Sequence, residues 1–150
     1  SCVDRVNGFL DGLGDSKDKF KIVAQQDGGA ALDKSMELAE DIITASPDMD
    51  AFFCINDPSA LGAAAAIKAA NKTGKIGVYS IDASPDGKQA LLDGEFTAVA
   101  CQVPVQIADY SFKEAVKYVN GDTKIDEKKV YLDSHLVSKD EAEKTLKEWQ

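Results

Sequence analysis

Residues 51–63 read AFFCINDPSALGA and combine a strand pattern, a polar junction and a helix start. Ala51 to Ile55 form a continuous apolar run of strand length, which is typical of a strand covered on both faces in a parallel sheet. Asp57-Pro58 predicts the helix start, with Asp57 as the N-cap residue and Pro58 at the first helical position. The stretch therefore predicts the strand–turn–helix unit from which α/β folds are built.

Strand and helix patterns alternate along the rest of the chain in the same way. Apolar residues at helical spacing predict helices over residues 2–13, 32–43, 57–72, 85–92, 105–119 and 139–149, the last after a Ser138-x-x-Glu141 capping box. Short apolar runs predict strands over residues 20–24, 51–55, 76–81, 96–101 and 130–132. We therefore expect an α/β fold of three layers (α/β/α), Rossmann-like, with a mostly parallel sheet.

The composition excludes several classes of partner. The chain has 150 residues, with 17 Lys and Arg against 26 Asp and Glu, which gives a formal net charge of −9. Nucleic acid is not an expected partner, because no basic patch is available to displace phosphate counterions. An anionic membrane surface is disfavoured for the same reason. No apolar run approaches the roughly 20 residues that span a bilayer, so we expect one soluble domain.

Three cysteines and one histidine limit the thiol and metal chemistry that the sequence can support. An odd number of widely spaced cysteines predicts neither a disulfide framework nor a zinc site, and we expect no metal and no cofactor. Cys54 and Cys101 lie inside apolar runs, where a free cysteine packs as a small hydrophobic residue. A reactive Cys–His couple would have to use His135, and this alternative stays open.

Polar side chains follow three successive predicted strands. Asn56, Asp82 and Gln102 each come directly at a strand end. Ligands of open parallel sheets bind outside the carboxyl ends of the strands. Together the three side chains offer donors and acceptors that suit a polar, uncharged ligand rich in hydroxyl groups. Taken singly, Asn56 and Asp82 could cap helices or shape turns, and Gln102 could bond loose backbone groups.

Three motifs carry a resemblance to a known family: FCINDPSALGA at 53–63, SIDASPDG at 80–87 and GEFTAVACQVP at 94–104. In this combination the chain resembles the periplasmic sugar-binding proteins of the ribose-binding type, which serve ABC importers. The resemblance covers essentially the whole chain, but only the C-terminal half of the family. It implies the type I periplasmic binding fold, no enzymatic activity, and a periplasmic or a lipid-anchored extracellular location.

The resemblance also implies which residues contact the ligand. The family's sugar-binding Asn, Asp and Gln correspond to Asn56, Asp82 and Gln102, and Arg5 stands at the family's spacing before a Gly-Phe pair. A sugar or polyol is the implied ligand, and an ABC transporter permease is the implied partner.

One position departs from the family pattern. Where the family places an aromatic ring that stacks on the sugar, this chain has Ala30, with Asp27 close before it. Gln26 and Asp27 could supply hydrogen bonds instead. The departure leaves open a smaller polyol, or a carbohydrate-derived signal such as autoinducer-2.

The family's two-lobe architecture leads to expectations about domains. Residues 1–150 are expected to form a single α/β lobe, with the other lobe preceding Ser1. Residues 105–137 are expected to hold the crossover segments that contact that lobe. The helix over 105–119 is apolar on nearly all sides, so we expect the isolated chain to self-associate through it.

Three other functions compete with sugar binding for transport. The effector domain of a LacI-family regulator shares the fold, but Gln102-Val103-Pro104 favours transport. A nucleotide-binding enzyme would need a G-x-G-x-x-G loop, which residues 25–30 lack. Residues 82–93 partly match a calcium loop, but a strand precedes them and Pro85 interrupts the pattern.

Overall fold

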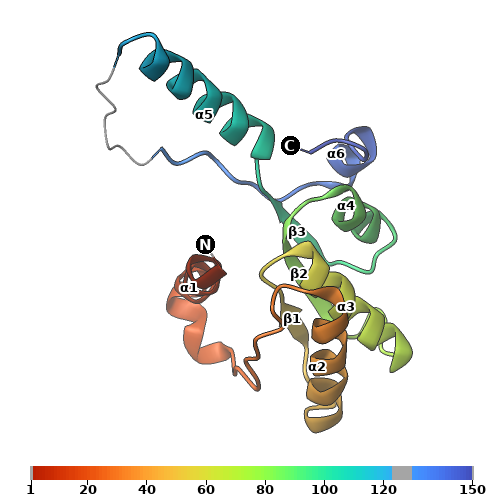
Figure 1. Cartoon of the computed structure of the whole chain (residues 1–150). Helices are drawn as coiled ribbons and strands as arrows, with labels where there is room; N and C mark the ends of the chain where they lie inside the picture. Colours follow the sequence, from red (N-terminus) through yellow and green to blue (C-terminus); the bar gives the residue numbers. More distant parts are fainter. Residues whose placement is uncertain (1, 123–129, 150) are drawn as a thin grey trace.

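A computed structural model of the chain describes residues 2–122 and 130–149 (Figure 1). The elements, in chain order, are α1 (Cys2–Gly12), the 3-10 helix η1 (Gly14–Lys19), α2 (Leu32–Ala45), β1 (Ala51–Phe53), α3 (Asp57–Ala69), β2 (Gly77–Asp82), α4 (Pro85–Leu92), β3 (Ala98–Cys101), α5 (Pro104–Val119) and α6 (Lys139–Lys144). No helix in the described ranges is both long enough and apolar enough to cross a membrane.

The three strands form one parallel sheet in the order β1-β2-β3. The predicted α/β class with a parallel sheet is confirmed. Residues on one face of the sheet are buried against the helices: Val78, Ser80, Val99 and Cys101. Figure 1 shows α2, α3 and α4 on this side, with α2 packed along α3.

The opposite face of the sheet has a thinner cover. Tyr79 pairs with Phe53 in the register, so both side chains lie on this face, and Tyr79 is exposed. The ring of Phe9 on α1 stacks on Phe53 with centroids 4.3 Å apart and planes 13° from parallel. This ring pair holds α1 against the sheet.

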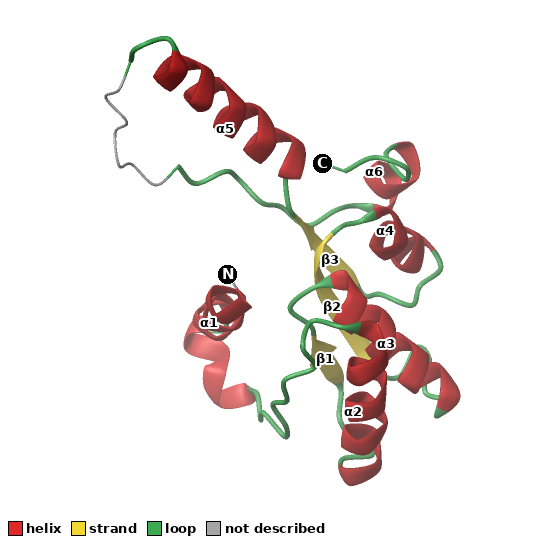
Figure 2. Cartoon of the chain, in the orientation of Figure 1, coloured by secondary structure: helices red, strands yellow, loops and turns green. Residues whose placement is uncertain are grey.

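Two predicted strands are wrong. Residues 20–24 form an extended loop between η1 and α2 (Figure 2), and Phe20, Ile22 and Val23 are exposed. The apolar run was typical of a buried strand, but a strand also needs a ladder partner, and the segment pairs with no described strand. Residues 130–132 are also unpaired; the contact with the sheet is a single antiparallel bridge further on, between Ala100 and Leu136.

Several helix boundaries differ from the prediction, by one or two residues in α1, α2 and α5 and in a more informative way in α3 and α6. The N-cap of α3 is Asn56, whose Oδ1 accepts a hydrogen bond from the Ser59 amide, so the predicted cap at Asp57 is wrong by one residue. α3 also ends at Ala69, before the predicted 72. α6 has the predicted N-cap, Ser138, but ends at Lys144 and does not continue to 149.

The buried carboxylate of Asp57 joins three elements. Asp57 is 1% exposed and is the first residue of α3. Its Oδ1 accepts from the Ser80 hydroxyl on β2 at 2.6 Å, and its Oδ2 accepts from the amide and the hydroxyl of Ser84, the N-cap of α4, both at 2.7 Å. Gly87 leaves room for this carboxylate, because a Cβ there would lie 2.1 Å from Oδ2.

Lys88 on α4 closes the C-terminal end of α6. Its side chain is fully buried, and its Nζ donates to the carbonyl oxygens of Thr145 at 2.9 Å and Glu148 at 2.8 Å. These carbonyls follow the end of α6, where backbone acceptors lack helical partners. Burial lowers the pKa of the Lys88 ammonium.

α5 projects away from the sheet, and none of its residues is buried (Figure 1). Two ion pairs within the helix, Lys113 with Asp109 at 2.7 Å and Lys117 with Glu114 at 2.6 Å, form its charged stripe. Large exposed apolar residues occupy the rest of its surface: Val105, Ile107, Tyr110, Phe112, Val116, Tyr118 and Val119.

We expect Asp57→Ala to lower the free energy of unfolding by about 2–4 kcal/mol, because the buried hydroxyl of Ser80 and the amide of Ser84 lose their acceptor. Urea denaturation followed by circular dichroism measures the change. Asp86→Ala, an exposed carboxylate in the first turn of α4, serves as the control and should cost about 1 kcal/mol or less. Equal losses in the two variants would contradict the role given to Asp57.

Candidate functional site

The three polar residues predicted at strand ends lie along the carboxyl edge of the sheet. Asn56 follows β1, Asp82 ends β2 and Gln102 follows β3. The backbone N–H of Gln102 donates to the backbone carbonyl of Asp82 at 3.0 Å, which sets the ends of β2 and β3 side by side. The structure therefore places these candidate residues at one edge of the sheet.

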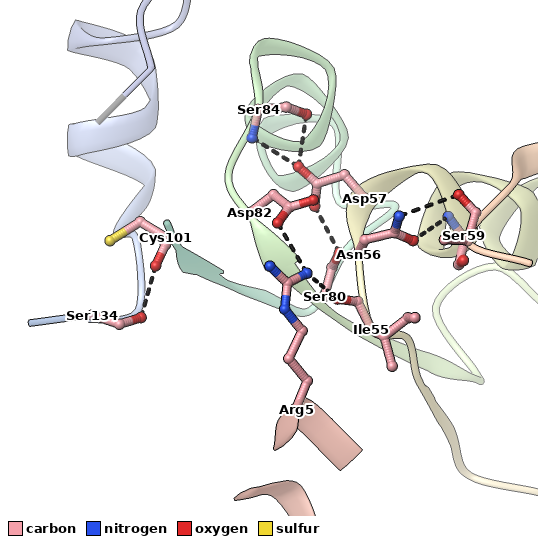
Figure 3. A network of polar contacts seen from close by, with 11 residues as sticks. Arg5, Ile55, Asn56, Asp57, Ser59, Ser80, Asp82, Ser84, Cys101 and Ser134 are labelled. Atoms are coloured by element: carbon pink, nitrogen blue, oxygen red, sulfur yellow. Dashed lines mark hydrogen bonds and ion pairs between the residues drawn. The ribbon is translucent and has the colours of Figure 1, made fainter. Parts of the chain in front are cut away.

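Arg5 reaches this edge from α1. Its Nη1 lies 3.1 Å from Asp82 Oδ1 and also donates to the carbonyl oxygen of Ile55 (Figure 3). The side chains of Arg5 and Asp82 are only 16% and 17% exposed. Arg5 thus spans the ends of β1 and β2, and the structure brings it together with Asp82.

The position of Arg5 depends on the aromatic pair described above. Arg5 and Phe9 are i,i+4 neighbours on α1 and lie on the same side of the helix. Because Phe9 stacks on Phe53, this side of α1 faces the sheet. The spacing of Arg5 and Phe9 can be read from the sequence, but the contact of Phe9 with Phe53 cannot.

Asp82 has an unusual backbone and a perturbed carboxyl group. Its φ is +134°, and Ala83 follows at +55°, in a region that side-chain-bearing residues seldom adopt. Burial raises the pKa of Asp82; the negative charge of Asp57 adds to the effect, and Arg5 opposes it. Strained backbone and a perturbed carboxyl group at one position are typical of functional sites.

Asn56 combines a structural role with a place in the site. Its Oδ1 caps α3, and its Nδ2 donates to the Ala30 carbonyl at 3.2 Å. That bond uses one of two N–H groups on Nδ2, and the described residues offer no hydrogen-bond partner to the other. The capping role and the binding role predicted from sequence are therefore compatible.

Gln102 is half-buried, and its side-chain amide makes no hydrogen bond with the residues that the structure describes. It can therefore donate to a ligand and accept from it.

The structure does not bring Gln26 and Asp27 to the site. Both are exposed, and Asp27 Oδ1 accepts from the Gly29 amide at 2.8 Å, which makes a local turn. Only the end of this loop reaches the site, through the Ala30 carbonyl. Ala30 has a φ of +55° and carries no ring.

The hydrogen-bond donors and acceptors of the site are suited to binding hydroxyl groups. Asp82 accepts, Arg5 donates, and the amides of Asn56 and Gln102 complete the set. The Arg5–Asp82 pair has no net charge, which favours an uncharged ligand. Within residues 2–122 and 130–149, no three His, Cys, Asp or Glu side chains cluster in a way that could hold a metal ion.

The sequence left open a contact between a cysteine thiol and the histidine ring, and the structure contains one such contact. Cys54 and Cys101 are both buried, as predicted. Cys101 alone meets the histidine, with Sγ 3.3 Å from His135 Nδ1.

Comparison with known sequences matches residues 1–123 to the periplasmic binding protein domain family. The ribose import binding protein RbsB of Salmonella typhimurium is 33% identical over 119 residues, which cover 79% of this chain and 39% of that protein. The D-apiose import binding protein of Actinobacillus succinogenes is 31% identical over 144 residues, covering 95% of this chain and 46% of that protein.

The solved structures that superpose well on this chain are also binding proteins of this kind. A galactofuranose binding protein superposes with a TM-score of 0.86 at 32% identity, covering 96% of this chain and 49% of its own. The Caulobacter myo-inositol binding protein, bound to myo-inositol, has a TM-score of 0.85 at 28% identity, covering 95% and 48%. The chain spans less than half the length of these relatives. The fold of the described residues is that of type I periplasmic binding proteins, and the chain belongs to the periplasmic binding protein family.

Proposed function

We propose that residues 1–150 form one lobe of a two-lobe solute-binding protein, which captures a neutral sugar or polyol for an ABC importer and makes no covalent change in it. The observation that carries the proposal is the Arg5–Asp82 ion pair at the carboxyl edge of the sheet, beside the amides of Asn56 and Gln102. Hydroxyl groups of the ligand donate to Asp82 and accept from the three nitrogen donors.

The relatives support the same class of ligand. They are named for ribose, D-apiose, galactofuranose and myo-inositol, all neutral and rich in hydroxyl groups. The names of the ribose and D-apiose proteins also describe import, which supports transport over the LacI-type regulator. Because Ala30 supplies no ring, we favour a compact polyol or a sugar that is held by hydrogen bonds more than by stacking.

The second lobe is the proposed neighbour of α5. In this proposal residues 105–137 cross to that lobe and return, and the apolar surface of α5 packs on it; residues 123–129 lie outside the described residues. The family's name supports a periplasmic location. A lipid-anchored extracellular form belongs to the same proposal.

We further propose that the isolated chain self-associates through α5. The two charges within each ion pair on the helix cancel, so the charged stripe does not repel a second copy. The apolar residues on the remaining surface would become buried in such a dimer.

We expect Asp82→Ala and Asn56→Ser in the two-lobe protein each to weaken ligand binding by about 1–3 kcal/mol, because ligand hydroxyl groups lose their partners. Serine retains the cap of α3, so Asn56→Ser removes the amide donor selectively. A thermal-shift screen with ribose, allose, myo-inositol and other polyols selects the probe, and calorimetry measures affinity. Gln26→Ala is the control and should leave affinity unchanged; unchanged affinity in all three variants would refute the site.

Ligand affinity should fall at acid pH. The pKa of Asp82 is raised above its ordinary 3.8, so on lowering the pH its carboxylate is lost earlier than that of an exposed aspartate. Protonation removes an acceptor and the negative partner of Arg5. Calorimetry across the acid range should show this loss in the parent, and Asp82→Asn should bind weakly at every pH without the step. A parent affinity that is constant across the range would contradict the role of the ionised Asp82.

The 150-residue chain should form dimers or larger species that Phe112→Glu returns towards monomer, because a charge would be placed in the apolar contact. Light scattering coupled to size exclusion measures the mass. Val3→Glu on α1 is a matched control, since Val3 and Phe112 are both 70% exposed. A monomeric parent at high concentration would contradict self-association through α5.

A further inference from the structure

A thiol, an imidazole and a carboxylate follow one another next to the candidate site, at the end of β3. Cys101 is the last residue of β3, and its Sγ lies 3.3 Å from His135 Nδ1. On the other side of the ring, His135 Nε2 lies 2.9 Å from Glu141 Oε1 on α6. This is the order of nucleophile, base and orienting group found in activated nucleophiles.

The hydrogen bonds assign a role to each ring nitrogen. The Glu141 carboxylate is an acceptor, so Nε2 carries the proton that it binds. Nδ1 is then left with its lone pair facing the thiol, which donates to it. In this arrangement the imidazole can take the thiol proton, while Glu141 stabilises the imidazolium that results.

The backbone of Glu141 is held in place within its own helix. The Glu141 amide donates to Ser138 Oγ at 3.2 Å, and the Glu141 carbonyl accepts from Thr145 Oγ1 at 2.8 Å. Glu141 is therefore fixed at the start of α6 and acts on the thiol only through His135, as a positioning residue.

A buried cation lies near the same thiol. The Lys88 ammonium bonds only to the carbonyl oxygens of Thr145 and Glu148 among the described residues, and its charge interacts with Cys101 and Glu141.

The other two cysteines provide internal comparisons. Cys54 is also buried, but no base in the described part of the chain contacts it, and burial raises its pKa to about 12. Cys2 is exposed on α1. The surroundings of Cys101 therefore differ from those of an ordinary buried cysteine and from those of an exposed one.

We propose that Cys101 is a nucleophilic thiol and a modification site for low-molecular-weight disulfides, covered at rest by the return segment, residues 130–137. His135 takes the thiol proton, and the thiolate attacks one sulfur of the disulfide. A bond forms between that sulfur and Cys101 while the S–S bond of the reagent breaks. The second sulfur leaves as a thiolate and receives the proton from His135, so the step needs no other oxidant.

The cover over Cys101 is thin enough to open locally. The return segment bonds to the sheet through the Cys101 amide to the His135 carbonyl and the Val137 amide to the Val99 carbonyl, both at 2.9 Å. Ser134 Oγ adds one bond to the Cys101 carbonyl at 2.7 Å (Figure 3). Val130, Tyr131 and Leu136 in the same segment are exposed, so its packing depends on the buried Val137 and on Leu132.

The test uses the full chain with one cysteine left in each form. Cys2→Ser with Cys54→Ser leaves Cys101, and Cys2→Ser with Cys101→Ser leaves Cys54. The probe is 5,5′-dithiobis(2-nitrobenzoate), whose released thiolate is followed by absorbance, with glutathione disulfide and mass spectrometry as a second readout. We expect Cys101 to react at least about tenfold faster than Cys54 at neutral pH.

Two substitutions separate chemistry from access. His135→Gln removes the base and also weakens the cover, so it should slow the reaction of Cys101 if His135 acts chemically and speed it if His135 only holds the cover. Ser134→Ala loosens the cover and leaves the base intact, and it should speed the reaction. Glu141→Gln gives a second test of the base and should slow the reaction in the same direction as His135→Gln.

Circular dichroism and hydrogen exchange at the Val137 amide check that each variant is folded and report how often the cover opens. Two results would overturn the proposal: a Cys101 that reacts no faster than Cys54, or a faster reaction in both His135→Gln and Glu141→Gln. The outcome does not depend on the identity of the sugar, so it is independent of the proposed transport function.

Discussion

The rest of the structure depends on one buried carboxylate. Asp57 takes hydrogen bonds from β2 and from the start of α4, while its own residue begins α3. A buried acceptor with three donors fixes these elements at one distance and one orientation, because any shift would leave a polar group without a partner. The carboxyl edge of the sheet is therefore rigid before any ligand arrives. The same charge also contributes to the raised pKa of Asp82, so the frame and the site are electrostatically linked.

The ion pair between Arg5 and Asp82 limits what the site can recognise. Each group satisfies the charge of the other, so a charged ligand would have to displace one of them from a largely buried pair. Hydroxyl groups can join the pair without breaking it, since both partners keep spare hydrogen-bonding capacity. In the proposed function, selectivity for neutral polyols would come from the neutralised pair and two amides, and the position of α1, set by the Phe9–Phe53 stack, would contribute to it.

The sequence predicted the local parts of this molecule better than the long-range ones. The apolar run at 51–55, the cap at Ser138 and the residues at strand ends follow from patterns within a few positions, and the structure places Arg5, Asn56, Asp82 and Gln102 at one edge. The runs at 20–24 and 130–132 failed as strands because periodicity indicates an apolar segment and does not reveal a ladder partner. Gln26 and Asp27 stay outside the site because a local turn satisfies Asp27. The roles of Asp57 and of the Cys101–His135 contact require partners 23 to 34 positions away, and no spacing rule supplies those.

The burial of Lys88 has a consequence for the order in which the chain folds. α6 has 6 residues, well below the length at which an isolated helix is stable in water, so it forms only against α4. The contacts that close its end join Lys88 to residues 57 and 60 positions later, which is a long loop to close. Docking of the C-terminal segment is therefore a late event, and it desolvates an ammonium group that stays hydrated until then. The stability of the carboxyl edge of the sheet and the stability of the C-terminal segment are consequently separable, and we expect unfolding of this chain to begin in the C-terminal segment.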